Sequence, residues 1–207
     1  MGRLVDLLIE PHCRDVRYLV VDRSPSHKEV ALPMSAAALP LIDARQLPVA
    51  LSPEEICDAA TVGLLREPTR TVEARLHSRL HWNPYWRRDE PDPDMSLQRV
   101  TKMTGMPVRC GRKPGGTISD LVIDCTDWSV VLVVVQIAPT RQRTEALVPT
   151  EFIDCIDWHV PSAELRLDRD ALIGEGTSRP QTLTAAGLSE IRRQFGLPRR
   201  RVGEGCA

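Results

Sequence analysis

Long hydrophobic runs are scarce in this sequence, and neither sign of charge is in excess. The longest uninterrupted apolar run, Val130 to Val135, falls far short of the ~20 residues that a membrane-spanning helix needs. The chain carries 27 basic and 28 acidic residues, and its only tight basic cluster is Arg199 to Arg201. We therefore expect no membrane span, and the charge balance disfavours direct binding of nucleic acid.

Aromatic residues are also few. With 4 Trp, 2 Tyr and 2 Phe among 207 residues, the core must rest on Val, Leu and Ile. The 6 cysteines form no C-x-x-C pair, and a strand-like run follows Met1 almost at once, which predicts no signal peptide. We expect reduced thiols and a soluble, cytoplasmic protein.

Catalytic and ligand-binding motifs are missing as well. The sequence has no G-x-S-x-G elbow, phosphate-binding loop or G-x-G-x-x-G motif, and the glycine-rich stretch from Gly111 to Gly116 is best interpreted as a turn. His77 and His81 have the spacing of metal ligands, but without a third ligand we interpret them as part of a solvated helix face. We predict no catalytic residue, no metal site and no cofactor, and hence not an enzyme.

An internal repeat is the main positive feature. Residues 2–22 align without a gap on residues 116–136, an offset of 114, with seven identical positions. These are Gly2/Gly116, Asp6/Asp120, Leu7/Leu121, Ile9/Ile123, Val16/Val130, Val20/Val134 and Val21/Val135. Three later blocks follow in the same order: 29–33 with 145–149, 42–43 with 156–157, and 51–56 with 167–172. Ordered matches of this kind indicate a duplication.

Each copy has the pattern of strands joined by turns. In copy 1, residues 4–9 and 16–21 are aliphatic runs separated by a turn-like stretch, which predicts a β-hairpin. A third strand is expected to end at Pro33 or Pro149 and a fourth at Leu51 or Leu167. Ser52-Pro53-Glu54-Glu55 then reads as a capping box that starts a helix, and Asp168 is the matching cap in copy 2. The recurring carboxylates Asp6/Asp120 and Glu10/Asp124 are expected to serve hairpin hydrogen bonding rather than acid–base chemistry.

These residues resemble the PRC-barrel family. The resemblance rests on Val16 to Asp22 in copy 1, and in copy 2 on Gly116, Asp120, Leu121, Trp128, Leu147 to Pro149, Ile156, Asp157 and Trp158. Bacterial tandem PRC-barrel proteins are similar in a further respect, a helical linker that ends near Pro-Tyr-Trp, here Trp82 to Trp86. The resemblance implies a mainly β fold: two small, partly open β-barrels from an internal duplication, with short α-helices in the linker and the C-terminal tail.

The expected organisation has four parts. Copy 1 occupies residues 1–59, a helical and acidic proline-rich linker 60–95, copy 2 residues 96–175, and a helical tail with a disordered end 176–207. Copy 2 has an opening strand segment, Leu97 to Val108, that copy 1 lacks. Two explanations stay open: barrel 1 has an open edge that invites pairing with another chain, or the true start lies upstream of Met1.

Linker and tail are expected to carry helices that pack on the barrels. Thr71 is the expected cap of a helix that runs to about His81, with Val72, Leu76 and Leu80 as its apolar stripe. Leu188, Ile191 and Phe195 show the same helical spacing in the tail. Trp82, Tyr85 and Trp86 either plug the space between the barrels or form a partner interface.

The leading hypothesis for function is a non-enzymatic interaction or assembly module. We expect a homodimer through the open edge at Leu4 and Val5 or through the three linker aromatics. The resemblance implies two alternatives. One is a peripheral component docked on a membrane electron-transfer complex like the photosynthetic reaction centre, and the other is a ribosome-associated or RNA-processing factor. The protein partner itself is not predicted.

Overall fold

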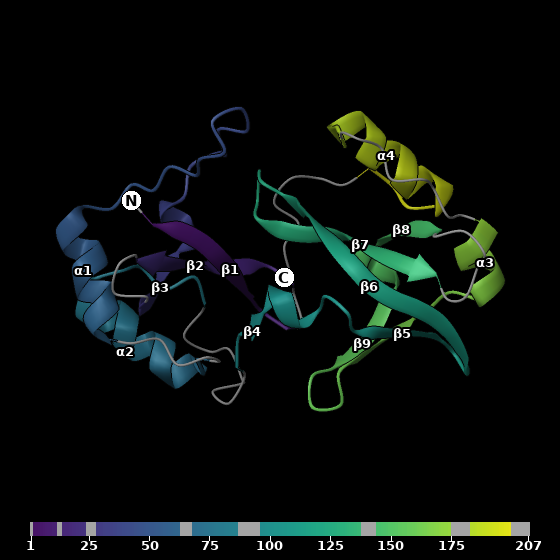
Figure 1. Cartoon of the computed structure of the whole chain (residues 1–207), viewed down its shortest axis with the longest axis horizontal. Helices are drawn as coiled ribbons and strands as arrows, with labels where there is room; N and C mark the ends of the chain where they lie inside the picture. The colour runs from purple at the N-terminus through teal and green to yellow at the C-terminus, as the bar shows by residue number, and fades with distance from the viewer. Residues whose placement is uncertain are drawn as a thin grey trace. The chain divides into compact units, whose positions relative to one another are not determined.

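The computed structural model describes residues 2–11, 14–23, 28–62, 68–86, 96–137, 144–174 and 183–199. The chain divides into two compact units, Met1–Thr101 and Lys102–Ala207 (Figure 1). The fold is mainly β, with a curled half-barrel sheet and a few short helices. The expected acidic spacer at 89–94 and the expected disordered end past Arg201 lie outside the described residues.

The first unit is built on an antiparallel meander. Strands β1 (Arg3–Ile9), β2 (Val16–Arg23) and β3 (Lys28–Pro33) follow one another, and the short β4 (Gln98–Arg99) pairs with the end of β1. A 3₁₀ turn, η1 (Met34–Ala36), follows β3, and helices α1 (Pro53–Val62) and α2 (Arg70–Leu80) come next. The sheet order is β3-β2-β1-β4. The core cluster joins sheet residues to Leu76 of α2 and to Leu97.

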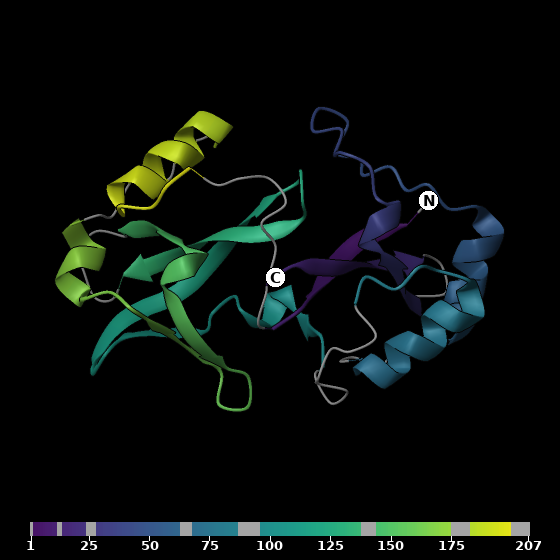
Figure 2. The same cartoon turned by 180° about the vertical axis from the view of Figure 1, so that it is seen from behind.

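The second unit has a larger sheet, ordered β8-β7-β6-β5-β10-β9, which curls as Figure 2 shows. After η2 (Val100–Lys102), its strands are β5 (Pro107–Cys110), β6 (Lys113–Asp124), β7 (Ser129–Ile137), β8 (Glu145–Pro149), β9 (Ile153–Asp157) and β10 (Ser162–Leu165). η3 (Thr150–Phe152), α3 (Arg169–Gly174) and α4 (Ala185–Gln194) complete it. The apolar run of β7 is buried almost throughout, and its residues Leu132 and Val134 form a core cluster with Leu147 of β8 and Ile191 of α4.

The meanders of the two units share strand order and register. Tyr18 pairs with Pro33 on β2 and β3, and the matching Leu132 pairs with Pro149 on β7 and β8. β1 has register shifts at Leu4/Asp6 and Leu8/Ile9, and β6 has them at the aligned positions Ile118/Asp120 and Val122/Ile123. The hairpin turns agree too, since Arg14 (φ 61°) and Trp128 (φ 58°) both adopt the left-handed conformation. The shared register shifts and the left-handed turn residues are similarities that the sequence alignment alone does not predict.

The repeated glycines have a steric reason. A Cβ on Gly2 would lie 2.9 Å from the carbonyl oxygen of Asp22, and one on Gly116 would lie 2.9 Å from the carbonyl carbon of Gln136, the residue that aligns with Asp22. Gly116 also has φ +147°, which disfavours any L side chain. Both glycines therefore allow close approach of the next strand's backbone.

The fourth strand and the start of copy 2 differ from the prediction. In the second unit the strand ends at Leu165 rather than Leu167, and in the first unit the matching segment forms only the isolated bridges Ala37↔Val49 and Leu41↔Gln46. The predicted strand from Leu97 to Val108 is divided into β4, which pairs with β1, and β5, which pairs with β6. The unit boundary accordingly lies after Thr101 and not at 95/96, because β4 adds to the first sheet.

The helices are mostly where the sequence places them. The capping box is confirmed, since Ser52 N donates to Glu55 Oε2 (2.7 Å) and Glu55 N donates to Ser52 Oγ (3.2 Å). The cap residue of α2 is Thr69 and not Thr71. α2 and α4 end alike: His81 and Gly196 are both left-handed, and Trp82 N and Leu197 N reach back to the carbonyls of His77 and Arg192.

Candidate functional site

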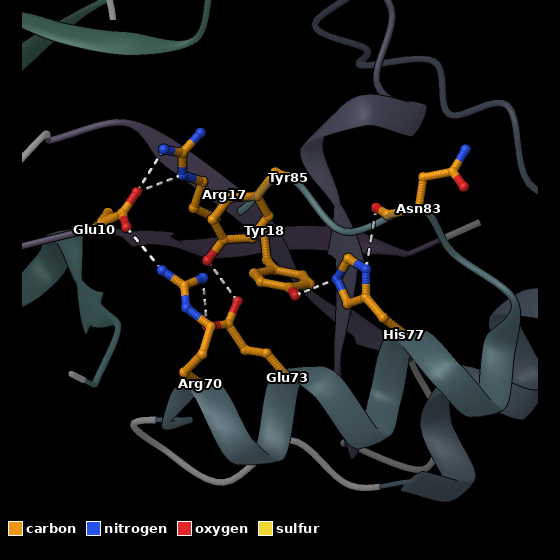
Figure 3. A network of polar contacts seen from close by, with 8 residues as sticks. All are labelled: Glu10, Arg17, Tyr18, Arg70, Glu73, His77, Asn83 and Tyr85. Carbon is orange, nitrogen blue, oxygen red and sulfur yellow. Dashed lines mark hydrogen bonds and ion pairs between the residues drawn. The ribbon is translucent and has the colours of Figure 1, made fainter. Parts of the chain in front are cut away.

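A cluster of buried polar and aromatic side chains joins α2 to the sheet of the first unit (Figure 3). The expected apolar stripe is present, with Leu76 fully buried, but Glu73 and His77 lie on the same inward side of the helix. The interpretation of His77 as part of a solvated face is therefore wrong, because its side chain is only 5% exposed. His81, in contrast, is exposed at the end of the helix.

Glu73 is the most deeply buried charged residue of this cluster, at 1% exposed. Its Oε1 accepts a hydrogen bond from the Tyr85 hydroxyl (2.6 Å), and its Oε2 lies 3.3 Å from Nη1 of Arg70. Burial raises the pKa of Glu73, while the hydrogen bond from Tyr85 and the charge of Arg70 oppose that shift. Burial beside this carboxylate also raises the pKa of Tyr85 far above its ordinary range.

Glu10 links the helix to the hairpin. Its Oε1 accepts from Arg70 Nη2 (2.9 Å), and its Oε2 accepts from Arg17 Nε (2.8 Å). Both guanidinium groups also lie over the ring of Tyr85, at 4.3 Å for Arg17 and 4.9 Å for Arg70. Two arginines thus share two carboxylates and one aromatic face, which balances the buried charge locally.

His77 is held by two different partners. Its Nε2 lies 2.6 Å from the Tyr18 hydroxyl and its Nδ1 lies 3.1 Å from the carbonyl oxygen of Asn83. A carbonyl can only accept, so Nδ1 carries the proton and Nε2 accepts from Tyr18. Burial lowers the pKa of His77, which favours this neutral form. Trp82 and Trp86 contact its ring edge to face, with centroids 5.8 and 4.7 Å away.

The polar groups of the cluster are bonded to partners within the first unit. The acid, base and hydroxyl groups named above are each bonded to one another or to a backbone carbonyl. Trp82 and Tyr85 pack against the first core cluster, and Trp86 lies against Tyr85 and His77. The predicted aromatic group therefore fastens the segment after α2 to its own unit.

The repeated carboxylates make hydrogen bonds within their hairpins, but Glu10 also reaches Arg70 of α2, and Asp6 reaches Arg99 and Thr101. Asp6 accepts from Leu7 N (2.8 Å) and from Thr101 Oγ1 (2.6 Å), and Arg99 Nη1 lies 3.5 Å from its Oδ2. Asp120 accepts from Leu121 N (2.8 Å) in the same way, and Asp124 accepts from Thr126 in the β6–β7 turn. Asp6 and Asp120 thus act at the register shifts of β1 and β6, and Asp124 acts in the turn that follows β6.

The remaining repeat positions of the second unit lie at turns. Trp128, half-buried, closes the β6–β7 turn through its N–H to the Asp124 carbonyl (2.7 Å). Asp157 accepts from the backbone of His159 and Val160 between β9 and β10, and these hydrogen bonds lower its pKa. Trp158 lies half-buried in the same turn. Their roles in the structure are local.

Several apolar side chains are exposed in the first unit. Leu39, Leu41 and Ile42 are 63, 51 and 82% exposed, and Leu4 on β1 is 46% exposed, while Val5 is half-buried. Leu47 and Val49 are half-buried, whereas Ala163 and Leu165 at the matching positions of β10 are 1 and 3% exposed. The difference arises because β5 pairs with β10 in the second unit, and no described strand pairs with residues 46–49.

The chain matches none of the protein-family models, and a search of curated proteins finds no match. Within the described ranges, no helix is both long and apolar enough to cross a membrane, and no group of three His, Cys, Asp or Glu side chains could hold a metal ion. We therefore infer function from the geometry of each unit.

Sequence reasoning missed the polar cluster almost completely. Glu73 and His77 each follow a residue of the apolar stripe, Val72 and Leu76, and so belong to a buried face wider than the stripe itself. Tyr18 was assigned only to a strand, although it is fully buried. The one usable signal was that Trp82, Tyr85 and Trp86 follow the helix closely enough to fold back on it.

Proposed function

We propose that this protein is a non-enzymatic assembly module of tandem PRC-barrel type, that its two units derive from a duplication, and that it forms a homodimer in the cytoplasm. The shared register of the two meanders, their matching bulges and the paired glycines support a duplication. The polar cluster, whose groups satisfy one another, supports a structural rather than a catalytic use of the buried acids and bases.

The observation that carries the proposal is the open edge of the first unit. In the second unit, β5 pairs with β6 at Thr117 and Gly116 on one side and with β10 on the other. The matching positions of the first unit are Gly2, Arg3 at the start of β1, and residues 46–49, and no described strand pairs with them on that side. An unpaired sheet edge with an exposed leucine on it, Leu4, is a template for pairing with another chain.

A second copy of this chain is the occupant that we propose. Antiparallel pairing of β1 with the β1 of a second copy uses the same surface on both chains, as a twofold dimer requires. It would cover Leu4 on each protomer, and we propose that the exposed side chains of Leu39, Leu41 and Ile42 also lie in this interface. Burial of such side chains contributes ~25 cal/mol per Å² of apolar area removed from water.

The test is the oligomeric state of the purified full chain, measured by sedimentation velocity over a range of concentrations. Wild type is expected to form a dimer, and the double variant Leu4→Lys/Ile42→Lys is expected to be a monomer, because both changes place charge on the proposed interface. Both side chains are exposed, so the fold should persist. Val160→Lys, a matched control at a 71% exposed apolar side chain of the second unit, should remain a dimer. A wild type that stays monomeric at every concentration, or a double variant that dimerises as well as wild type, refutes the proposal.

A further inference from the structure

A second surface, independent of the dimer edge, lies in the second unit. A groove of about 390 Å³ runs between the end of β6 with its turn and the first turns of α4. Its walls are mainly apolar and include Val122, Ile123, Cys125, Val131, Leu183 and Leu188. Val122, Leu183 and Leu188 also pack against the core cluster of this unit, so the groove opens directly onto the core.

In the first unit, the position that corresponds to this groove is occupied by β4 and the two residues before it. Leu8 and Ile9 of β1 align with Val122 and Ile123, and they pair with Arg99 and Gln98 of β4. The same short segment bridges to the residues just before α2, since Thr69 pairs with Ser96 and Leu97 N donates to the Pro68 carbonyl (3.0 Å). Leu97 is completely buried in the core cluster. Residues 96–99 thus connect the edge of β1 to the start of α2, and they insert the Leu97 side chain into the core cluster.

The second unit has the same two docking elements. Leu183 and Thr184 precede α4 as Pro68 and Thr69 precede α2. β5 pairs with β6 only between Lys113 and Thr117, so no described strand covers β6 at Val122 to Asp124 on the side away from β7. Asp120 accepts from the next backbone N–H as Asp6 does, and Asp6 is the carboxylate that Arg99 of β4 approaches.

We propose that this groove binds an extended segment of a partner protein in the manner of Ser96 to Arg99. The segment adds as an antiparallel strand to the end of β6, buries one leucine-like side chain between Val122, Leu183 and Leu188, and places an arginine two residues later near Asp120. Main-chain pairing gives affinity in this mode, and the aliphatic and basic positions give specificity. The ligand class is thus an aliphatic-x-basic peptide, and the site is distinct from the homodimer edge.

The test uses a fluorescent peptide with the sequence of residues 96–101, titrated into the full-length protein and followed by anisotropy. The same titration is made with Leu4→Lys/Ile42→Lys, so that peptide binding is measured whether or not the protein forms a dimer. We expect saturable binding, at least a tenfold loss when the peptide leucine is replaced by Asp, and at least a tenfold loss for Ala185→Arg. Ala185 is exposed on the groove wall, so arginine there obstructs entry, whereas Ala186→Arg, on an exposed neighbour outside the groove, should bind as wild type does.

Alkylation provides a second readout at the site. Cys125 lines the groove, and bound peptide should slow its modification by iodoacetamide at least threefold, while exposed Cys155 reacts unchanged. Absence of saturable binding, or equal binding by Ala185→Arg and wild type, overturns the proposal. So does a Cys125 that is protected without peptide and becomes reactive when residues 200–207 are deleted, since that result would assign the groove to the chain's own tail.

Discussion

Replacing Tyr85 by Phe tests the buried cluster at its most sharply defined bond. The change removes only the hydroxyl that donates to Glu73 Oε1 over 2.6 Å, and it leaves the ring in place under Arg17 and Arg70. A hydrogen bond to a charged group contributes ~1.5–3 kcal/mol, and the variant leaves the buried Glu73 carboxylate with one donor fewer. We expect the free energy of unfolding of the first unit to fall by about 2 kcal/mol, measured by urea unfolding with circular dichroism and a fit that allows a transition for each unit.

A double-mutant cycle separates the energy of the Tyr85–Glu73 hydrogen bond from other effects of the Tyr85→Phe substitution on stability. Glu73→Leu is the natural partner change, because Leu188 occupies the matching place on α4 of the second unit. In the Glu73→Leu background, Tyr85→Phe should cost less than ~0.5 kcal/mol, which leaves a coupling energy of at least ~1.5 kcal/mol. If Tyr85→Phe has the same cost in both backgrounds, the hydroxyl does not stabilise Glu73 and the description of the cluster is wrong.

Two further predictions concern pH and backbone sterics. Burial raises the pKa of Glu73 above its ordinary 4.5, so the folded state keeps this proton to higher pH than the unfolded chain does. The stability that this proton contributes is lost as pH rises from 4.5 through the folded pKa. The free energy of unfolding of wild type should therefore decline relative to that of Glu73→Gln across that window in urea titrations at stepped pH, and a constant difference would contradict the raised pKa. Gly116→Ala should lower the unfolding temperature by several degrees, because residue 116 has φ +147° and a Cβ there meets the backbone of Gln136. Gly174 has open space around it, so Gly174→Ala should change the unfolding temperature little. Equal effects of the two substitutions would contradict the steric explanation.

Local patterns predicted the local elements well. The aliphatic runs at 4–9 and 16–21 are strands β1 and β2, and the capping box at Ser52 starts α1 as expected. Leu188, Ile191 and Phe195 lie together against the second core, as their spacing indicates. These features depend on neighbours within one turn or one hairpin, which the sequence displays directly.

Features that depend on distant partners were not predictable from the sequence. Leu97 looked like the start of a strand of copy 2, but its backbone bonds to Pro68 and its side chain fills the first core. His77 looked solvated because its partners Tyr18 and Asn83 lie on other segments. A fourth strand was expected to end at Leu51, yet residues 37–49 form only isolated bridges, because no described strand gives them the support that β5 gives β10. In each case long-range pairing overrides local pattern.

Hydrogen exchange at β1 tests the central claim most directly. Amides of Arg3 to Val5 that do not bond to β2 lie at the free edge of the first sheet, where we propose that a second copy pairs. Their exchange should slow as protein concentration rises through the range of the dimer, and it should be fast and independent of concentration in Leu4→Lys/Ile42→Lys. The account predicts protection confined to this edge and to residues 39–49; a dimer that leaves these amides unprotected, and protects another surface instead, would contradict it.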